Sequence, residues 1–496
     1  MRTFALCAAL GAAAALDDSR SWYKRGNTNK DCAWVSEYSG KRCTVKGFDR
    51  TLAQDACLDT CTQSITVKKH PPYNGPIDQK IKASSPCDGK HCFNRYSAQI
   101  PMAAMVPDGS VIEFETTDLW DEPGWDETNI ADANLNMDLV FKDIDIVHIL
   151  TGPVGIIGAK AGDKVSIEIL DITPVRKVHQ AYTFGGPGLG FLSDILKPED
   201  VTWAWWDYDA DGDCWKSPLF PDVIVPYKPF PGSLGVLPSQ EYTDYILETM
   251  ADETGIYGGP AWPIQPNLAI PQSICGAAGS APGTCLRTLE PGAFFGNTDS
   301  QRMMRGTTLV LDCMIDGCGI GIGDVHGAQG DGEVSITGIE MAAKVVIKAT
   351  ILRADHPAFK AASLRMYGTD SIRLASPGEW ISFMGFPFKE KTFTPAQYRG
   401  ESGSSALKYS NSLIIPESMS LAGRNALHTM NNFLVEFGGY TYGEANVLTS
   451  VMCDLRVAQL VDKPAVGVEA VLALDYFKGE TYKNLKRAAY PGYVEL

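Results

Sequence analysis

The chain has 496 residues, of which 45% are hydrophobic and 21% are charged. This composition is typical of a folded protein with a large buried core, and it excludes a disordered chain. The formal net charge of -16 argues against nucleic acid or an anionic membrane surface as a partner. The 48 glycines and 30 prolines indicate many turns and favour a fold rich in strands and loops.

The N-terminus has the pattern of a secretory signal peptide over residues 1–16. Arg2 supplies a positive charge, an apolar stretch begins at Phe4, and Ala13-x-Ala15 fits a small-residue cleavage site. A buried N-terminal helix is the alternative interpretation. No later apolar run is long enough to span a bilayer. We therefore expect a protein that is secreted or lies in the lumen of the secretory pathway.

The cysteines agree with this location. The chain has 13 cysteines, and removing Cys7 with the signal peptide leaves an even number, which favours disulfides in an oxidising compartment. Four of them fall within residues 31–61 and predict a small disulfide-rich module: Cys32, Cys43, Cys57 and Cys61. Zinc binding is the alternative for this module, although its spacing does not fit a zinc finger and no histidine lies among its cysteines. Its ligand and activity are not indicated.

A linker is expected over residues 62–95, and the main domain over 96–496. Within the linker, Cys87 and Cys92 are close enough in sequence to bridge locally. Alternation of apolar and polar residues then predicts a series of strands. These strands are expected at 99–105, 110–117, 139–149, 155–157, 164–172 and 307–313, with one or two more over 334–353.

A helix is expected near 240–252. Two amphipathic helices are expected at 421–437 and 443–461, where apolar residues recur mostly at spacings of three and four. The stretch 466–477 returns to the pattern of a strand. The expected fold is therefore mainly β, with a few helices, notably near the C-terminus.

An acidic segment at 203–215 resembles part of a calcium-binding loop. Asp207, Asp209, Asp211 and Gly212 follow the first half of an EF-hand pattern, but position twelve is Pro218 where a glutamate is required. A complete EF-hand is therefore excluded. A simpler calcium-binding hairpin and a surface turn beside buried tryptophans remain the two interpretations.

The most informative stretch spans residues 321–340. Asp324, His326, Asp331 and Glu333 lie there within ten positions, separated by glycines that allow close approach of the backbone to a ligand. Carboxylate and imidazole groups are ordinary ligands of zinc and other divalent metals. A glycine-rich hairpin with solvated charges is the alternative.

The segment GDVHGAQGDGE at 323–333 resembles the GDxHxxQGDGE signature of the acetamidase/formamidase family. Five further blocks resemble that family in the same order, at 114–120, 147–163, 231–238, 295–299 and 454–461. The chain departs from the family pattern at Phe295, where a glycine is usual, and at Gly327, where an alanine is usual. The resemblance does not extend to residues 1–95.

This resemblance implies a β-rich sandwich fold and metal-dependent hydrolysis of a short aliphatic amide, such as formamide or acetamide, to a carboxylate and ammonia. It also implies a homo-oligomer. Zinc is the expected metal, and calcium remains possible at a second, structural site. We expect Asp324, His326 and Glu115 to be metal ligands. Glu333 is the expected general base and acid, with Asp331 either a ligand or an orienting group, and the roles of these carboxylates can be exchanged.

Three further residues are candidates for contact with the substrate. His148 is expected to contact the substrate or a proton of the ammonia, with a structural histidine as the alternative. Asn297 and Asp299 are expected to orient the amide, although both residue types also cap turns.

Other mechanisms and functions fit less well. A serine hydrolase would need a GxSxG motif, which the sequence lacks, and a cysteine nucleophile would need a free thiol. Cys313 and Cys318 lie near the signature and are candidates for a mutual disulfide, while Cys453 falls in an expected helix. The alternative function is an inactive binding or wall-associated protein that keeps the fold. A third hypothesis is calcium-stabilised adhesion through the 207–213 aspartates.

Overall fold

The computed structural model describes residues 72–118, 144–175, 181–185, 202–220, 224–257, 264–333, 335–368, 379–387, 418–440, 445, 449, 453–462, 466–474 and 477–490. These residues form two units. The large unit contains most of the strands and all of the described helices, and the small unit contains Tyr208–Lys216 and Phe220–Tyr227. The expected signal peptide at 1–16 and the cysteine-rich module at 31–61 lie outside the described residues.

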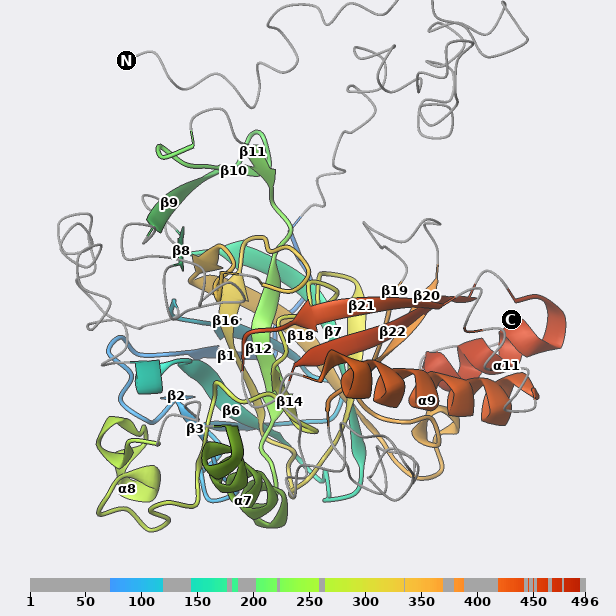
Figure 1. The fold of residues 1–496 in the computed structure, drawn as a ribbon, viewed down its shortest axis with the longest axis horizontal. Coiled ribbons are helices and arrows are strands. Elements are labelled where there is room, and N and C mark those ends of the chain that lie inside the picture. The colour runs from blue at the N-terminus through green and yellow to red at the C-terminus, as the bar shows by residue number, and fades with distance from the viewer. Residues whose placement is uncertain are drawn as a thin grey trace, which may run out of the picture. The chain divides into compact units, whose positions relative to one another are not determined.

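The first sheet of the large unit has nine strands, with the order β1-β5-β18-β7-β15-β19-β20-β22-β21 (Figure 1). Their bounds are β1 Gln79–Lys82, β5 Val111–Glu115, β7 Lys164–Pro174, β15 Thr307–Asp312, β18 Ala343–Leu352, β19 Arg365–Gly368, β20 Trp380–Gly385, β21 Cys453–Gln459 and β22 Gly467–Ala473. All neighbours are antiparallel except β1 and β5.

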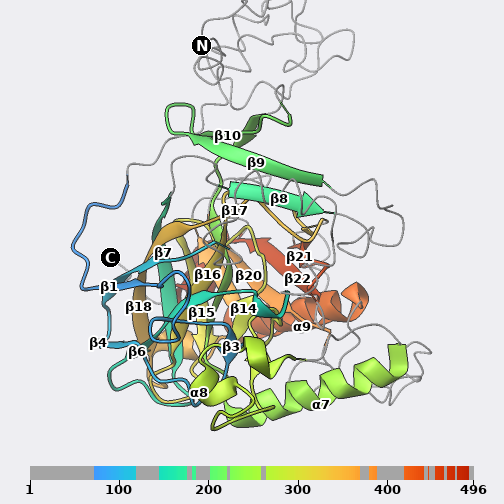
Figure 2. The same ribbon diagram turned by 90° about the vertical axis from the view of Figure 1, so that its left-hand side faces the viewer.

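The second sheet carries the residues of the candidate site. Its main path in the large unit is β9-β8-β17-β16-β12-β14, and β6 pairs with β16, β2 and β4 (Figure 2). The bounds are β2 Cys92–Phe93, β4 Ala104–Val106, β6 Leu150–Ile156, β8 Ala181–Gly185, β9 Thr202–Asp209, β12 Phe230–Val236, β14 Phe295–Asn297, β16 Ile320–His326 and β17 Glu340–Met341. A separate pair joins β3 Arg95–Tyr96 to β13 Leu286–Arg287.

The two central strands of the second sheet are buried along their whole length. Every residue of β12 and β16 is buried, which is typical of strands covered on both faces. Glycines in β16 allow this packing. A Cβ atom at Gly323 would lie only 2.4 Å from the carbonyl oxygen of Ile149, so no larger residue fits beside β6 at that point.

Helix α9, Met419–Gly438, covers β20 and β22 of the first sheet (Figure 1). It begins at the N-cap Ser418, whose side chain accepts the backbone N–H of Leu421, and ends before Gly439 in the left-handed conformation (φ 78°). Met430, Phe433 and Leu434 pack there in a buried apolar cluster. The other helices are α7 Gln240–Tyr257, α8 Gln272–Cys275 and α11 Gly479–Ala489, with short 3-10 turns η2 Ile144–Ile146, η4 Pro266–Leu268 and η5 Pro357–Phe359.

The small unit contains the candidate calcium loop. Strands β10 Cys214–Lys216 and β11 Ile224–Pro226 pair antiparallel. One carboxylate oxygen of Asp209 accepts the backbone N–H groups of Asp211 and Gly212, and the other pairs with Lys216 Nζ at 2.9 Å. Asp209 therefore already has donors on both oxygens, one of them a cation.

Most expected elements are confirmed. Helices α7 and α9 fall on the two ranges expected at 240–252 and 421–437, and β5, β7, β15 and β22 fall on expected strands. The fold class, mainly β with a helix near the C-terminus, is confirmed as well. Three described disulfides join Cys87 to Cys92, Cys275 to Cys285 and Cys313 to Cys318, and the first and third confirm bridges considered from sequence.

The helix expected over 443–461 is confirmed at its described residues Ala445 and Thr449, which are helical, but it is wrong from Cys453 on. Residues 453–459 form β21, which pairs with β22. Apolar residues at spacings of three and four favour a helix, but pairing with β22 gives residues 453–459 the backbone hydrogen bonds of a strand. Cys453 consequently lies in a strand, and its thiol is free.

Two expected strands need correction. Residues 144–146 form the 3-10 turn η2 and not part of a strand, and the strand expected from residue 99 begins only at Ala104. Within the range expected as a linker, the described residues include β1, β2 and the first residue of β3, which pair with β5, β6 and β13. Helix α11 was not anticipated.

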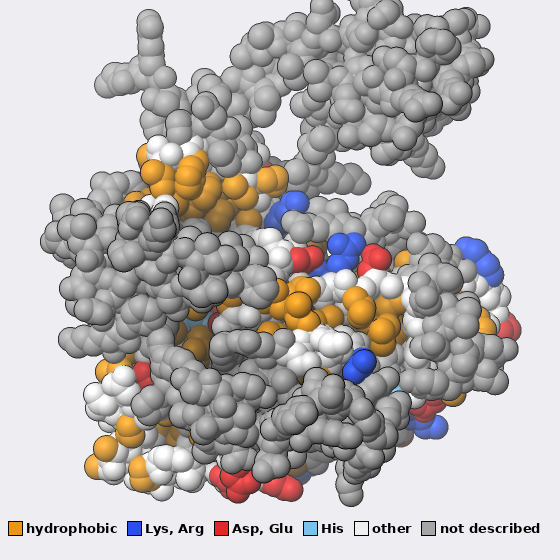
Figure 3. Space-filling model, in the orientation of Figure 1, with side chains coloured by type: hydrophobic (Ala, Val, Ile, Leu, Met, Phe, Trp, Pro, Cys, Tyr) orange, Lys and Arg blue, Asp and Glu red, His pale blue; other side chains and the backbone are white. Residues whose placement is uncertain are grey.

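On the described part of the face shown in Figure 3, apolar side chains gather near the top and the centre, and acidic side chains gather at the bottom. None of the described helices is long and apolar enough to cross a membrane.

Candidate active site

The site begins on β16, which presents Asp324 and His326 two residues apart and therefore on the same face of the sheet. In the register of the second sheet, His326 lies directly opposite Glu340 of β17 on one side and Phe230 of β12 on the other. Directly opposed residues bring their side chains together. The Phe230 and His326 rings accordingly meet edge to face, with centroids 5.1 Å apart.

His326 faces four carboxylates through one ring nitrogen. Its Nε2 atom lies 3.2 Å from Glu340, 3.6 Å from Asp324, 3.8 Å from Asp299 and 4.0 Å from Glu333. The other nitrogen, Nδ1, lies 2.5 Å from Gln329 Oε1. Because an amide oxygen only accepts, Nδ1 carries a proton there and Nε2 is left to face the carboxylates.

Three of these carboxylates occupy unusual backbone positions. Asp299, Asp324 and Glu333 have φ angles of 46°, 52° and 46°, in the left-handed region that few non-glycine residues adopt. Strain of this kind concentrates at functional sites, where the surroundings enforce it. The two aspartates also converge on Gly232, where a Cβ atom would lie 2.5 Å from Asp299 Oδ1 and 2.7 Å from Asp324 Oδ2.

Burial and mutual repulsion shift the pKa values of this cluster. Burial raises the pKa of Glu340 to about 7 and that of Asp462, a nearby carboxylate, to about 7. Burial also raises the pKa values of Asp299 and Glu333 well above the usual range, and neighbouring carboxylates add to both shifts.

Asp324 and His326 shift in the directions expected for a charged pair. Burial by itself raises the pKa of Asp324, but His148 and His326 outweigh it and lower the pKa to about 2. Burial by itself lowers the pKa of His326, but Glu340 and Asp324 raise it well above its usual value.

A chain of polar side chains leads away from Asp324. His148 Nδ1 lies 3.2 Å from Asp324 Oδ2 and 3.3 Å from Ser233 Oγ. Ser233, which lies opposite Asn297 in the register of β12 and β14, donates to Asn297 Oδ1 at 2.8 Å. The amide nitrogen of Asn297 then donates to Asp462 Oδ2 at 2.8 Å. The chain therefore joins His148 to Asp462 through side chains of two adjacent strands.

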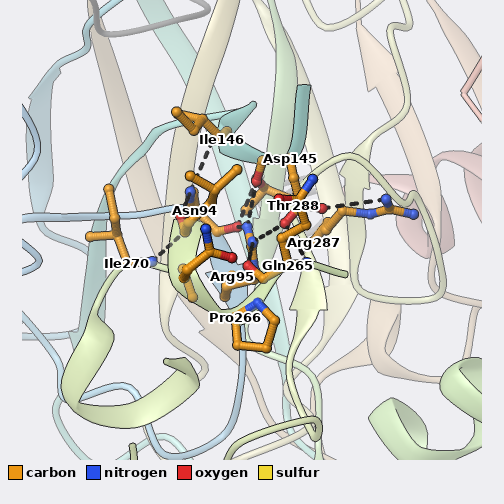
Figure 4. A network of polar contacts seen from close by, with 12 residues as sticks. Asn94, Arg95, Asp145, Ile146, Gln265, Pro266, Ile270, Arg287 and Thr288 are labelled. Carbon is orange, nitrogen blue, oxygen red and sulfur yellow. Dashed lines mark hydrogen bonds and ion pairs between the residues drawn. The ribbon is translucent and has the colours of Figure 1, made fainter. Parts of the chain in front are cut away.

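A second buried polar network includes Arg95, Asp145, Arg287 and Thr288 (Figure 4). It holds the backbone at His148. Thr288 Oγ1 accepts the backbone N–H of His148 at 2.7 Å and donates to its carbonyl oxygen at 2.6 Å. Arg95 pairs with Asp145, three residues before His148, and donates to the Asp145 carbonyl at 2.8 Å. Arg287 Nη1 also lies near Asp145 Oδ1, at 3.4 Å.

The structure brings together most of the residues proposed from sequence. Asp324, His326, Glu333, Asp299, Asn297 and His148 all lie in or beside the cluster. Asp331 accepts a hydrogen bond from Gln301 and lies 3.4 Å from Arg302. Asp331 is therefore placed to hold the loop that carries Glu333.

Glu115 does not join the cluster. Its carboxylate pairs with Lys82 at 2.5 Å and with Lys344 at 3.5 Å, both on neighbouring strands of the first sheet. The alternation of β5 correctly placed Glu115 on the face opposite the buried Phe114, but that face carries lysines. The expectation that Glu115 is a third metal ligand is thus not supported by its contacts.

Glu340, Asp462 and Ser233 were missed from sequence. Glu340 gave one usable signal, an acidic residue within the apolar run that follows the signature. Nothing in the sequence alone pairs β17 with β16. Asp462 follows β21, so its approach to Asn297 depends on how the two sheets pack.

The donor set fits a divalent metal ion. Two groups of side chains place ligand atoms within 4.8 Å of one another: Asp324, His326 and Glu340, and Asp299, His326 and Glu333. Several buried oxygens of these groups accept no hydrogen bond from any described residue, namely both of Asp299, Oδ1 of Asp324, Oε2 of Glu333 and Oε2 of Glu340. Buried carboxylates without donors are costly unless a cation or a proton is bound.

Comparison with known proteins identifies the family. A model described as the Acetamidase/Formamidase family matches residues 77–479. The chain therefore belongs to the acetamidase/formamidase family. This membership makes it an amide-cleaving hydrolase by class, and the family resemblance noted in the sequence is confirmed.

Individual relatives are distant. An acetamidase of Mycolicibacterium smegmatis is 27% identical over 319 residues, which cover 59% of this chain and 73% of that protein. A formamidase of Methylophilus methylotrophus is 29% identical over 273 residues, which cover 52% and 64%. The crystal structure of an acetamidase from Bacillus halodurans has a TM-score of 0.55 at 21% identity and covers 80% of this chain and 98% of its own. At that identity the structural likeness establishes the fold.

Proposed function

We propose that this protein hydrolyses short aliphatic amides of the formamide or acetamide type to a carboxylate and ammonia, with the help of a divalent metal ion. The observation that supports this most is the buried His326 Nε2 atom, which faces four carboxylates at the family signature. The names of the relatives, acetamidase and formamidase, support the substrate class.

Asp324, His326 and Glu340 are the proposed metal ligands, because Glu340 and Asp324 lie nearest to His326 Nε2. Glu340 takes the place expected for Glu115. A set of one imidazole and two carboxylates favours zinc over calcium, which prefers oxygen ligands alone. Such an ion would polarise the amide carbonyl and make a bound water acidic. A second, calcium-binding role for the 207–213 loop is weakened by the pairing of Asp209 with Lys216.

Proton transfer is assigned to Glu333. An amide nitrogen leaves as ammonia only when it is protonated, so a group must take a proton from water and return it to nitrogen. Glu333 Oε2 is buried and accepts no hydrogen bond from a described residue, which leaves it available for this transfer. Asp331, held by Gln301 and Arg302, positions the Glu333 loop. His148 is placed to contact the substrate, and Asn297 fixes Ser233 and Asp462 around it.

The test is ammonia release from formamide, acetamide and larger amides by the purified protein, before and after chelation and metal restoration. We expect release that returns with metal and is lost in Glu333→Gln. No release from any amide, with the metal still bound, would contradict the proposal and favour an inactive binding protein.

We further propose that the protein is secreted and forms homo-oligomers. The three described disulfides support an oxidising compartment. The expected signal peptide would be tested by N-terminal sequencing of the mature protein, and the oligomer by its mass in solution. The net charge of -16 supports a small molecule as ligand over nucleic acid.

A further inference from the structure

The carboxylates of the site divide into two groups around His326. Glu340 and Asp324 are the nearer pair, at 3.2 and 3.6 Å from Nε2, and they complete the proposed metal site. Asp299 and Glu333 lie farther from the same atom, at 3.8 and 4.0 Å. Asp462 joins this second group through Asn297, which lies two residues before Asp299 and donates to Asp462 Oδ2 at 2.8 Å. The charge of Asp462 also acts on both Asp299 and Glu333.

The second group consists of acceptors with few donors. Both oxygens of Asp299 and Oε2 of Glu333 are buried and accept no hydrogen bond from a described residue. The amide of Asn297, which bonds Asp462 Oδ2, is the one donor that the described part of the chain aims at these three carboxylates. No ion pair with a described lysine or arginine reaches them.

The charge of the site also exceeds what one metal ion neutralises. The site contains five buried carboxylates, namely the four that face His326 and Asp462, which is bonded by Asn297. A divalent ion bound by Asp324 and Glu340 balances that pair and leaves the second group with His326, shared with the metal site, as its nearest positive partner. The buried oxygens of this group are then stabilised either by protons or by a ligand that brings N–H donors, positive charge or both.

We propose that Asp299, Glu333 and Asp462 form the subsite for the nitrogen of the substrate, where they accept the N–H groups of a primary amide and then hold the ammonium ion that is released. This inference rests on the proposed amidase function and assigns its leaving-group side to named residues. Asp299 and Asp462 are binding residues in this role, while Glu333 also carries the proton.

The chemistry balances without any further reactant. The carbon–nitrogen bond of the amide breaks and a carbon–oxygen bond to water forms. Glu333 moves one water proton to nitrogen, which gives ammonia and a carboxylic acid. The proton of that acid then passes to ammonia, so the products are a carboxylate and ammonium. Ammonium offers four N–H donors, and the three described orphan oxygens are acceptors for them.

The subsite also predicts selectivity for primary amides. An N-methyl amide lacks one N–H donor and would place a methyl group against buried carboxylates. A site built to bond an N–H group strongly disfavours an analogue without it, because the buried acceptor is left unpaired.

The experiment measures binding of ammonium to the metal-loaded protein, by calorimetry with ammonium chloride and with potassium chloride as the control at equal ionic strength. We expect ammonium to bind and potassium not to compete at the same concentration. Asp462→Asn should weaken ammonium binding by about tenfold or more, since it removes one buried charge from the contact. Metal content should stay unchanged, because Asp462 is not a proposed ligand.

Two further variants make the test decisive. Asp454→Asn removes an exposed carboxylate that pairs with Arg456 and controls for the change in net charge. Asp299→Asn repeats the test if Asp462→Asn does not fold, since asparagine tolerates the left-handed backbone at residue 299. Equal effects of ammonium and potassium, or unchanged ammonium binding in the Asp462 and Asp299 variants, would overturn the subsite.

Failure of the ammonium subsite can be distinguished from failure of the proposed amidase function. Ammonium binding that depends on Asp462 in a protein that releases no ammonia from any amide would reject the hydrolase and retain the subsite. Conversely, hydrolysis of formamide and N-methylformamide at similar kcat/KM would retain the hydrolase and reject the subsite.

Discussion

Two clusters of buried charged side chains lie in the large unit, and they differ in how far their positive and negative charges balance. The cluster around Asp145 contains two arginines, Arg95 and Arg287, and two carboxylates, Asp145 and Glu290, paired with one another (Figure 4). The cluster around His326 contains five carboxylates, and no described arginine or lysine pairs with them. Both are buried to a similar degree, so burial alone does not separate a structural cluster from a functional one.

The difference lies in what each cluster still needs. In the Asp145 cluster the carboxylate oxygens of Asp145 already receive Arg95, Arg287 and the backbone N–H of Gln265, and among the described residues only Oε2 of Glu290 is left without a donor. In the His326 cluster, oxygens of four residues receive no donor from the described chain. The first cluster fixes the backbone up to His148, and the second is arranged to bind something the chain does not supply.

Loss of a partner in the balanced cluster should have the largest effect on stability. Asp145→Ala leaves Arg95 buried without its carboxylate, and removal of one partner of a buried pair costs about 3–5 kcal/mol. We expect the free energy of unfolding to fall by that amount, measured by denaturant unfolding. Asp316→Ala, which removes an exposed carboxylate paired with Lys160, is the matched control and should change stability little.

The acidic cluster should respond in the opposite sense. Glu340→Gln removes a buried charge from a repulsive group, so the metal-free protein should melt at a higher temperature than the metal-free wild type. Metal content should fall, and amide hydrolysis should fall by about 100-fold or more because a ligand is lost. A metal-free variant that melts at a lower temperature than wild type would contradict the contrast between the two clusters.

The connection between the clusters can be tested at Thr288. Thr288→Val keeps the shape but removes the hydroxyl that bonds the backbone of His148 on both sides. We expect kcat to fall by about tenfold while metal content is kept, since His148 is displaced and no ligand is lost. Thr288→Ser should restore kcat because it retains the hydroxyl. If the serine variant is as impaired as the valine variant, the hydroxyl is not what positions His148.

The smallest expected effect is the change in stability of the metal-free protein with pH. The pKa values of Glu340 and Asp462 are raised to about 7 in the folded state, above about 4 for an unfolded carboxyl. Between these values the folded state binds more protons than the unfolded state, so the contribution of the two groups to stability falls as pH rises from about 4 to about 7. Melting temperatures across this range, with and without metal, would measure it, and bound metal should reduce the loss.

The sequence predicted the part of the site that is local in the chain. Asp324, His326 and Glu333 were found because they share one short segment, and β16 places the first two on one face. Asn297, Asp299 and His148 were found through the family pattern. Glu115 lies beside Lys82 and Lys344 and not beside these residues. Alternation along β5 indicates which face a side chain occupies but not which residues of β1 and β18 lie beside it.

The sequence by itself determined the mainly β fold, the family and the residues of the signature, because each depends on patterns within short segments. Tertiary structure decided the rest of the site. Glu340 reaches His326 only through the pairing of β16 with β17, and Asp462 reaches Asn297 only through the packing of the two sheets. Such contacts join residues far apart in the chain, and local periodicity carries no information about which distant strands will meet.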